Sequence, residues 1–187
     1  MAVNFNISAF KEAIGAGSRP NLFRVSVTPP SGYPLSNFNY LCRSASLPAD
    51  TMGLIEIPMA AGRRLKLAGD RTFPDFTTTV LNDDGFKIRS NIEKWQNDMV
   101  KTNFGLSSIG KRTVSSKDAN GAAIVPLTTG TLEIFQLSET GNDVTGGKVK
   151  LFNCWPSDIS AIDLSYDTTD TVEEFTITWT YDYHINS

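Results

Sequence analysis

The sequence contains few of the residues from which catalytic and metal sites are usually built. Its 187 residues include one histidine, His184, and two cysteines, Cys42 and Cys154. Because His184 is the only histidine, we expect no Ser-His-Asp triad, Cys-His pair or multi-histidine zinc site. In a terminal segment, this histidine is predicted to be solvated. The two cysteines lie among apolar neighbours and are predicted to be buried free thiols. We therefore predict no catalytic residue, no cofactor site and no metal site, and a protein that is not an enzyme.

Long apolar runs and a signal sequence are also absent. No apolar run approaches the ~20 residues that a membrane span requires, and the N-terminal segment lacks the basic and apolar regions of a signal peptide. The net charge is −3 and the isoelectric point is near 5.2, whereas nucleic-acid readers are usually basic. We therefore expect neither membrane insertion by this chain nor tight, specific binding of DNA.

Positive charge stops at Lys150. All 17 Lys and Arg residues lie at or before this position, and seven acids follow it. Within the cation-free part, residues 172–183 alternate as a strand with one buried face does. The apolar face comprises Phe175, Ile177, Trp179, Tyr181 and Tyr183. The wet face comprises Glu174, Thr176, Thr178, Thr180 and Asp182. Such polarity suggests opposite-signed surfaces that meet between copies, or a surface built not to hold polyanions.

The remaining patterns predict a mainly β protein. A single domain of this length can bury a sizeable core without disulfides, and neither an internal repeat nor a linker divides residues 1–187. Predicted strands cover residues 22–28, 38–43, 64–67, 72–81, 131–137, 149–154, 162–166 and 172–183. The first two are expected to form a hairpin, and the next two a pair joined by a tight turn at Gly69-Asp70. We predict a β-sandwich or partial barrel of about eight strands with one flanking helix.

The one long helix is predicted over residues 84–101. Ile88, Ile92, Trp95 and Met99 recur at spacings of four, three and four, which places a single apolar stripe against the sheet. The two aspartates at positions 83 and 84 are interpreted as helix caps, with a metal or general-base site as the weaker alternative. A short helix is also expected within an N-terminal arm formed by residues 1–18.

Two segments do not fit this core. Residues 46–59 hold Leu54, Ile55, Ile57 and Met59 without strict alternation, and a lone soluble domain would have to hide such apolar side chains. Residues 102–130 are rich in Ser, Gly, Thr and Asn, and are expected to form a long loop or an insertion.

An ordered series of short motifs runs through the chain. Its members are Arg19-Pro20-Asn21, Leu47-Pro48, Gly69-Asp70-Arg71-Thr72-Phe73, Trp95, Trp155-Pro156 and Phe175. In order and spacing, this series resembles the tail tube proteins of T-even-like contractile-tailed bacteriophages over residues 19–183. The Gly-Asp-Arg-Thr-Phe block is its most specific part. The turn between the first two strands and residues 102–130 depart from the family pattern.

The resemblance implies a structural role in a virion that is assembled in the host cytoplasm. Proteins of this family share their fold with the type VI secretion tube protein, close into rings of six subunits, and stack into a hollow tube inside a contractile sheath. The implied partners are further copies of the chain, the tail sheath protein, the baseplate proteins and the tail terminator protein. DNA would pass through the tube without specific binding.

Three expectations about the assembly follow from the resemblance together with the residue patterns. Ring closure would remove open sheet edges by joining neighbours into one barrel. Residues 46–59 would form a loop that contacts the next ring. The wet face of residues 172–183 would line the channel, because it offers no cation to the phosphates of passing DNA.

Two other functions remain as alternatives. A tube terminator or a baseplate tube initiator can share this fold. A β-sandwich carbohydrate-binding or adhesin module would also have Thr-rich strands, but it would normally expose a cluster of aromatic side chains. Here Trp95, Trp155 and Trp179 all occupy core-like positions in the sequence pattern.

Overall fold

The computed structural model describes residues 6–15, 17–30, 32–99, 129–167 and 169–186. The predicted loop at 102–130 lies outside these residues, apart from its last two. The elements in chain order are α1 (Ile7–Ile14), β1 (Phe23–Thr28), α2 (Phe38–Leu41), β2 (Cys42–Ala45), β3 (Thr51–Pro58), η1 (Ala60–Gly62), β4 (Arg64–Thr72), β5 (Phe76–Leu81), α3 (Lys87–Met99), β6 (Gly130–Leu137), β7 (Asp143–Ile159), β8 (Glu174–Thr180) and β9 (Tyr183–Asn186). The mainly β prediction is confirmed.

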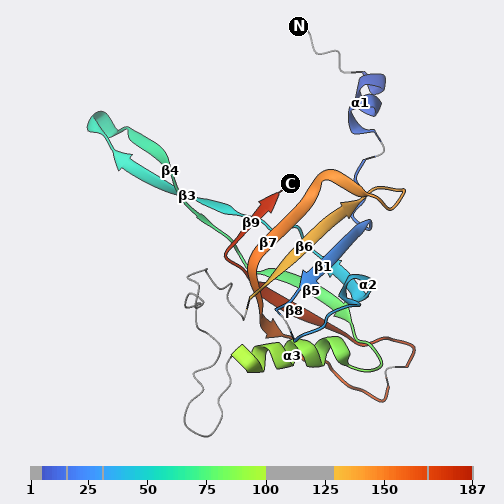
Figure 1. The fold of residues 1–187 in the computed structure, drawn as a ribbon. Coiled ribbons are helices and arrows are strands. Elements are labelled where there is room, and N and C mark those ends of the chain that lie inside the picture. Colours follow the sequence, from blue (N-terminus) through green and yellow to red (C-terminus); the bar gives the residue numbers. More distant parts are fainter. Residues whose placement is uncertain (1–5, 16, 31, 100–128, 168, 187) are drawn as a thin grey trace, which may run out of the picture.

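Seven of the strands form one antiparallel sheet that folds into two layers (Figure 1). Its order is β1-β6-β7-β8-β5-β2, and β9 pairs with β7. The long strand β7 belongs to both layers, because residues 143–154 pair with β6 and β9 whereas residues 155–159 pair with β8. Asn153, with a φ of 55°, lies where β7 changes partners, and asparagine tolerates this left-handed conformation better than most residues. We call the two layers the β6 layer (β1, β6, β9 and residues 143–154) and the β8 layer (β2, β5, β8 and residues 155–159).

The core lies between the two layers. The β6 layer contributes Val25, Leu132, Ile134, Val149 and Leu151, and the β8 layer contributes Phe76, Val80, Phe175, Ile177 and Trp179. Phe38 of the short helix α2 packs edge-on against Trp179, with ring centroids 6.1 Å apart. The indole Nε1 of Trp179 donates a hydrogen bond to the buried Thr78 Oγ1 at 2.9 Å, so the indole N–H keeps a partner inside the core.

Helix α3 packs against the open end of the two layers. Ile88, Ile92 and Trp95 are buried, and the half-buried Met99 packs against the same cluster. Trp95 stacks on Tyr33 at 6.0 Å and lies 6.0 Å from Trp179. The start of the helix is capped by Asp83, whose Oδ1 accepts a hydrogen bond from the Ile88 amide at 3.3 Å. The interpretation of this aspartate as a cap therefore fits the structure, and α3 buries one continuous apolar stripe.

The segment at 46–59 is not a loop. It contains β3, which pairs with β4 in a two-stranded hairpin that projects away from the main sheet (Figure 1). The predicted turn at Gly69-Asp70 is also wrong, because both residues lie inside β4. Gly69 crosses Gly53 so closely that a Cβ at position 69 would lie 3.0 Å from the Gly53 backbone. A side chain would force the two strands apart at the irregular register between Met52 and Leu54.

Two other strand predictions fail. Residues 38–43 do not form a hairpin with the first strand, because α2 occupies 38–41, β2 pairs with β5, and β1 pairs with β6. The alternation at 38–43 is overridden because Phe38 fills the core through a helical turn. Residues 162–166 form no strand, and their apolar Leu164 and Tyr166 are exposed. Alternation describes polarity only, and among the described residues no strand pairs with this segment.

His184 is buried rather than solvated. It lies in β9, opposite Leu151 of β7, and it is 7% exposed. Its ring packs edge-on against Phe73 at 5.3 Å and lies 6.2 Å from Tyr181. Burial, together with the nearby positive charge of Arg71, lowers the pKa of His184. The prediction of a solvated residue was wrong because the last residues form a ninth strand instead of a free end.

This burial predicts a pH dependence of stability. A lowered pKa means that the folded protein resists a proton that the unfolded chain accepts, so stability should fall as the pH drops below the ordinary histidine value of 6.5. We expect the urea concentration at the unfolding midpoint to decrease when the pH is lowered from 7.5 to 5.5. In a His184→Phe variant the decrease should be smaller, since only the carboxylates then titrate. An equal decrease in both proteins would contradict the assignment.

Candidate assembly surfaces

The outer face of the β8 layer is lined with hydroxyl groups. In β8, Thr176, Thr178 and Thr180 are half-buried on this face, and Glu174 is exposed at its end. Thr79 and Thr77 of β5 lie directly opposite Thr176 and Thr178, so threonines face each other across two strands. The inward face carries Phe175, Ile177, Trp179 and Tyr181, all buried. Tyr183, predicted for the same apolar face, is instead 42% exposed, because it belongs to β9.

The polar groups on this face engage one another. Thr180 Oγ1 donates to Asp75 Oδ1 at 3.0 Å, and Ser157 Oγ donates to the Thr178 carbonyl at 3.1 Å. Asp182 lies beyond the end of β8, where its Oδ2 accepts from Asn153 Nδ2 at 2.6 Å. These contacts fix the side chains of Thr180, Ser157 and Asp182 in the polar array on this face.

One cation does reach this array, which the sequence pattern missed. Arg43 of β2 forms an ion pair with Glu174 at the start of β8. The pattern within residues 172–183 could not reveal it, because Arg43 lies in a distant segment that β5 separates from β8. Since Arg43 is paired with a carboxylate, it adds no uncompensated positive charge to the threonine array.

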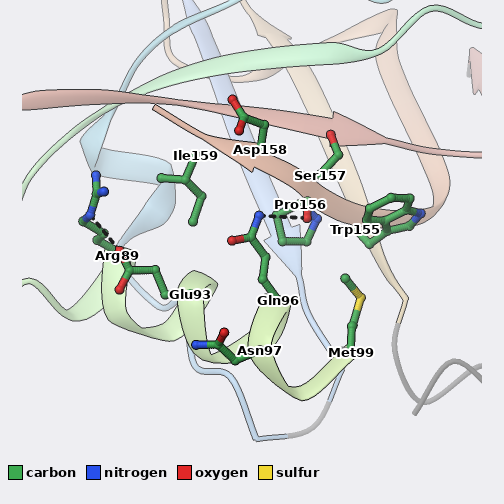
Figure 2. A pocket seen from close by; sticks show the side chains of 10 residues that line it. All are labelled: Arg89, Glu93, Gln96, Asn97, Met99, Trp155, Pro156, Ser157, Asp158 and Ile159. Carbon is green, nitrogen blue, oxygen red and sulfur yellow. Dashed lines mark hydrogen bonds and ion pairs between the residues drawn. The ribbon is translucent and has the colours of Figure 1, made fainter. Parts of the chain in front are cut away.

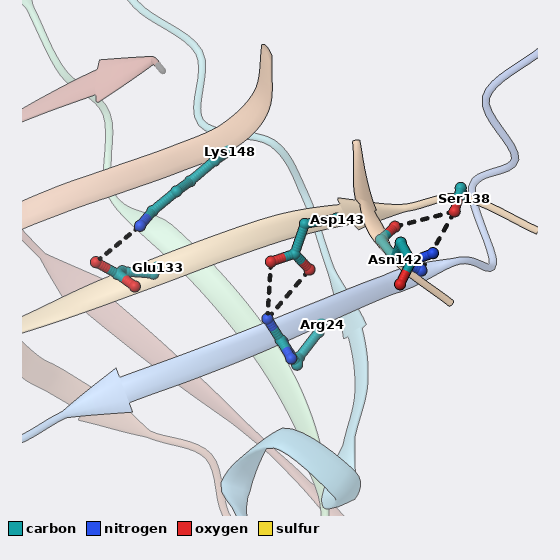
Figure 3. Close-up of polar contacts among 6 residues, drawn as sticks. All are labelled: Arg24, Glu133, Ser138, Asn142, Asp143 and Lys148. Carbon is teal, nitrogen blue, oxygen red and sulfur yellow. Dashed lines mark hydrogen bonds and ion pairs between the residues drawn. The ribbon is translucent and has the colours of Figure 1, made fainter. Parts of the chain in front are cut away.

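The outer face of the β6 layer has the opposite character. Arg24 and Lys148 project from it beside Asp143 and Glu133 (Figure 3), and Lys150 also pairs with Glu133. Arg24 donates to both oxygens of Asp143, at 3.1 and 3.2 Å. Glu133 Oε1 lies 3.0 Å from Lys150 Nζ and 3.4 Å from Lys148 Nζ. Burial alone would raise the pKa of Glu133, but the two lysines outweigh it and lower the pKa.

Aromatic rings separate these cations. Phe135 lies under Arg24 and Lys148, whose charged groups are 4.5 and 5.0 Å from the ring centroid. Phe152 stacks on Tyr183 at 4.9 Å and faces Lys150 at 5.4 Å. The protein therefore presents a hydroxyl-lined face on one layer and a cationic, aromatic face on the other.

The β3–β4 hairpin exposes apolar side chains on both of its faces. The residues of 46–59 that the sequence singled out are all accessible: Leu54 is 58% exposed, Ile55 51%, Ile57 43% and Met59 56%. Leu65 and Leu67 of β4 are exposed as well. Successive residues of a strand point to opposite faces, so neither face of the hairpin is purely polar. Apolar surface of this kind on a projecting element marks an interaction site.

The motif residues lie just before β1 and at the base of the β3–β4 hairpin. Arg19 forms an ion pair with Glu139 at 2.6 Å, and it precedes β1 together with Pro20 and Asn21. At the base of the hairpin, Gly69 and Asp70 lie in β4, and Arg71 pairs with Asp50. The guanidinium of Arg71 also lies 5.0 Å from the Phe73 ring centroid. The most specific sequence block therefore anchors the hairpin to the body.

A groove between α3 and residues 155–159 shows no catalytic arrangement (Figure 2). Gln96 Nε2 donates to the Pro156 carbonyl at 3.2 Å, and Arg89 Nε donates to Glu93 Oε1 at 2.9 Å. The Gln96 bond fastens the helix to the sheet, whereas the Arg89–Glu93 bond lies within α3. Among the described residues, no group of three or more His, Cys, Asp or Glu side chains could hold a metal ion. The described helices also include none with the length and apolarity needed to cross a bilayer.

The comparisons with known proteins show which family the chain belongs to. A family model described as "Phage tail tube protein" matches residues 16–187. The tail tube protein gp19 of Enterobacteria phage T4 is 30% identical over 171 residues, covering 90% of this chain and 91% of that protein. The chain belongs to the phage tail tube protein family. The gp19 tail tube protein of Enterobacteria phage T6 matches to the same extent.

Solved structures reproduce the fold of this tail tube protein at lower identity. A chain in the sheath–tube complex of the PVC extracellular contractile injection system, in its extended state, has a TM-score of 0.59 at 15% identity. The match covers 97% of this chain and 99% of that one. A chain of the anti-feeding prophage baseplate has a TM-score of 0.61 at 12% identity, with 91% and 95% covered. The family model and the gp19 relatives confirm the family resemblance drawn from the motif series.

Proposed function

We propose that this protein is the structural subunit of the inner tube of a contractile phage tail. Its copies form rings of six that stack into a hollow tube, which conducts DNA during ejection without catalysing a reaction. The observation that carries the proposal is the relationship to a tail tube protein across nine-tenths of both chains. The hydrogen-bonded, structural use of the α3 groove is compatible with a passive role.

The ring is proposed to close through the β8 layer. Among the described residues, β2 pairs only with β5, and residues 155–159 pair only with β8, so each leaves one strand edge without a β partner. Pro156 lies on one of these edges, where a residue without an N–H is tolerated. Joining these edges between neighbours would continue the layer around the ring and would remove the exposed edges.

In this arrangement the outer face of the β8 layer lines the channel. Glu174, Thr176, Thr178, Thr180 and Asp182 then face the passing duplex. DNA carries one charge per ~1.7 Å of axis, and each cation that pairs with a phosphate releases counterions and strengthens binding. A wall of threonines, with Arg43 paired to Glu174, gives the duplex little to bind.

The other surfaces are then available for the remaining partners. We propose that the hairpin, with Leu54, Ile55, Ile57 and Met59, contacts the adjacent ring. The outer face of the β6 layer is proposed to face the tail sheath protein, while the first and last rings meet the baseplate and the tail terminator. The protein is accordingly a virion component, assembled in the host cytoplasm.

Adding cations to the channel wall tests this arrangement. Thr176→Lys with Thr178→Lys places two charges per subunit on the half-buried, hydrated side of β8, so tubes should still assemble. DNA ejection from phage particles should become at least several-fold slower at low salt and should recover partly at high salt, because counterion release weakens as salt rises.

The matched control is Thr176→Gln with Thr178→Gln, which lengthens the same side chains without adding charge. This variant should eject DNA at the normal rate. Equal rates for the lysine variant and the control at every salt concentration would place the threonine face away from the channel.

A further inference from the structure

The tip of the β3–β4 hairpin carries positive charge that the chain itself does not neutralise. We define the hairpin tip as residues 54–67. It contains three cations, Arg63, Arg64 and Lys66, and a single acid, Glu56. Glu56 is engaged by Arg64 at 2.6 Å, and within the described part of the chain Arg63 and Lys66 make no ion pair. The tip is therefore both apolar and basic.

The connection between β7 and β8 has the complementary composition. Its exposed apolar side chains are Leu164 (79%), Val172 (67%) and the fully exposed Tyr166. Among its acids, Asp163, Asp167 and Asp170 are exposed and form no ion pair with any described residue. The whole connection lies beyond Lys150, so it contains no cation.

These two surfaces lie on opposite sides of the molecule. The hairpin extends away from one side of the main sheet, whereas the connection between β7 and β8 lies beyond the other side, past α3 and β5 (Figure 1). They cannot meet within one chain. Complementary patches at opposite ends of a subunit produce a head-to-tail contact, which repeats without closing and builds filaments.

We propose that the hairpin tip of one copy docks on the β7–β8 connection of a copy in the adjacent ring. Ile55, Ile57 and Leu65, which share one face of the hairpin, pack near Leu164 and Tyr166, and Arg63 and Lys66 pair with Asp163 and Asp167. This inference rests on the proposed tube function and names the receiving surface of the stacking contact. Apolar contact supplies the buried area, and opposite charges select the register and reject wrong partners.

A charge exchange tests this contact. Arg63→Glu with Lys66→Glu should leave folded rings but reduce mean tube length at least tenfold in electron micrographs. Asp163→Lys with Asp167→Lys should do the same. The protein that carries all four substitutions should again form long tubes, since the pairs are restored with reversed sign.

The matched control restores the net charge elsewhere. Arg63→Glu and Lys66→Glu are combined with Glu12→Lys in α1 and Glu139→Lys in the β6–β7 turn, two exposed acids. This protein should remain short. Rescue by the control to the same extent, or no rescue by the fourfold exchange, would overturn the inference. A wild-type protein that forms no tubes would overturn the proposed function itself.

Cross-linking provides a readout that does not depend on rescue. The variant with Ile57→Cys and Leu164→Cys should form tubes of normal length. Treating these tubes with a short bis-maleimide should give a ladder of covalently linked chains. Ile57→Cys combined with Ile185→Cys, another exposed position, should not. Background from the native thiols should be low, because burial raises the pKa of Cys42 and of Cys154 to about 12. A ladder of equal strength from both proteins would contradict the contact.

Discussion

Replacing Leu54 and Ile55 with aspartate is expected to abolish tubes while leaving folded rings. Both side chains are more than half exposed in the isolated subunit, so the fold does not depend on them. In a stacked tube they would be covered by the next ring, and desolvating unpaired carboxylates in an interface costs several kcal/mol per contact. That cost is repeated in every subunit of a ring, so the loss of stacking should be complete in electron micrographs.

The control for this prediction keeps the two positions apolar. Leu54→Met with Ile55→Val changes shape and volume slightly and should give tubes of normal length. Circular dichroism should show the same β content in all three proteins. Tubes of normal length from the aspartate variant would mean that the hairpin is not the stacking contact.

Truncating Trp95 to alanine is expected to destabilise the subunit by about 3–5 kcal/mol. The side chain is 1% exposed and packs between Tyr33 and Trp179, so its removal leaves a cavity where α3 meets both layers. Because small domains are only marginally stable, this loss should prevent soluble expression or assembly at 37 °C. Urea denaturation at lower temperature would give the free-energy change.

An exposed aromatic side chain provides the comparison. Tyr40 is 81% exposed on α2, and Tyr40→Ala should change the free energy of unfolding by less than about 0.5 kcal/mol. A Trp95→Ala protein that unfolds within 1 kcal/mol of the wild type would contradict the place of Trp95 in the core.

The sequence predicted most accurately the elements that bury one face along their whole length. The alternation around Phe175, Ile177 and Trp179 marked β8, because one face of a strand at the centre of a layer meets the core throughout. The spacing of Ile88, Ile92 and Trp95 marked α3 for the same reason. In both cases the local pattern and the tertiary burial agree.

The failures arose where partners come from distant segments. Residues 38–43 are divided between α2 and β2 because Phe38 is needed beside Trp179, a contact that no local pattern reveals. Residues 64–67 were predicted as a strand, but the pairing of β4 with β3 was missed, because neither strand has a buried face that marks its partner. The apolar content of the hairpin still marked it as a surface that has to be covered. The position of Arg43 beside the threonine face was also missed, because its partner Glu174 lies far away in the sequence.

Cryo-electron microscopy of the purified full-length protein would examine the tube and its channel together. The proposed function predicts hollow tubes built from stacked six-fold rings, with the threonine face of β8 directed into the channel and the β6 layer outside. Isolated rings would instead indicate a terminator or an initiator. Monomers at high concentration, or tubes whose channel is lined by Arg24, Lys148 and Lys150, would contradict the proposed function.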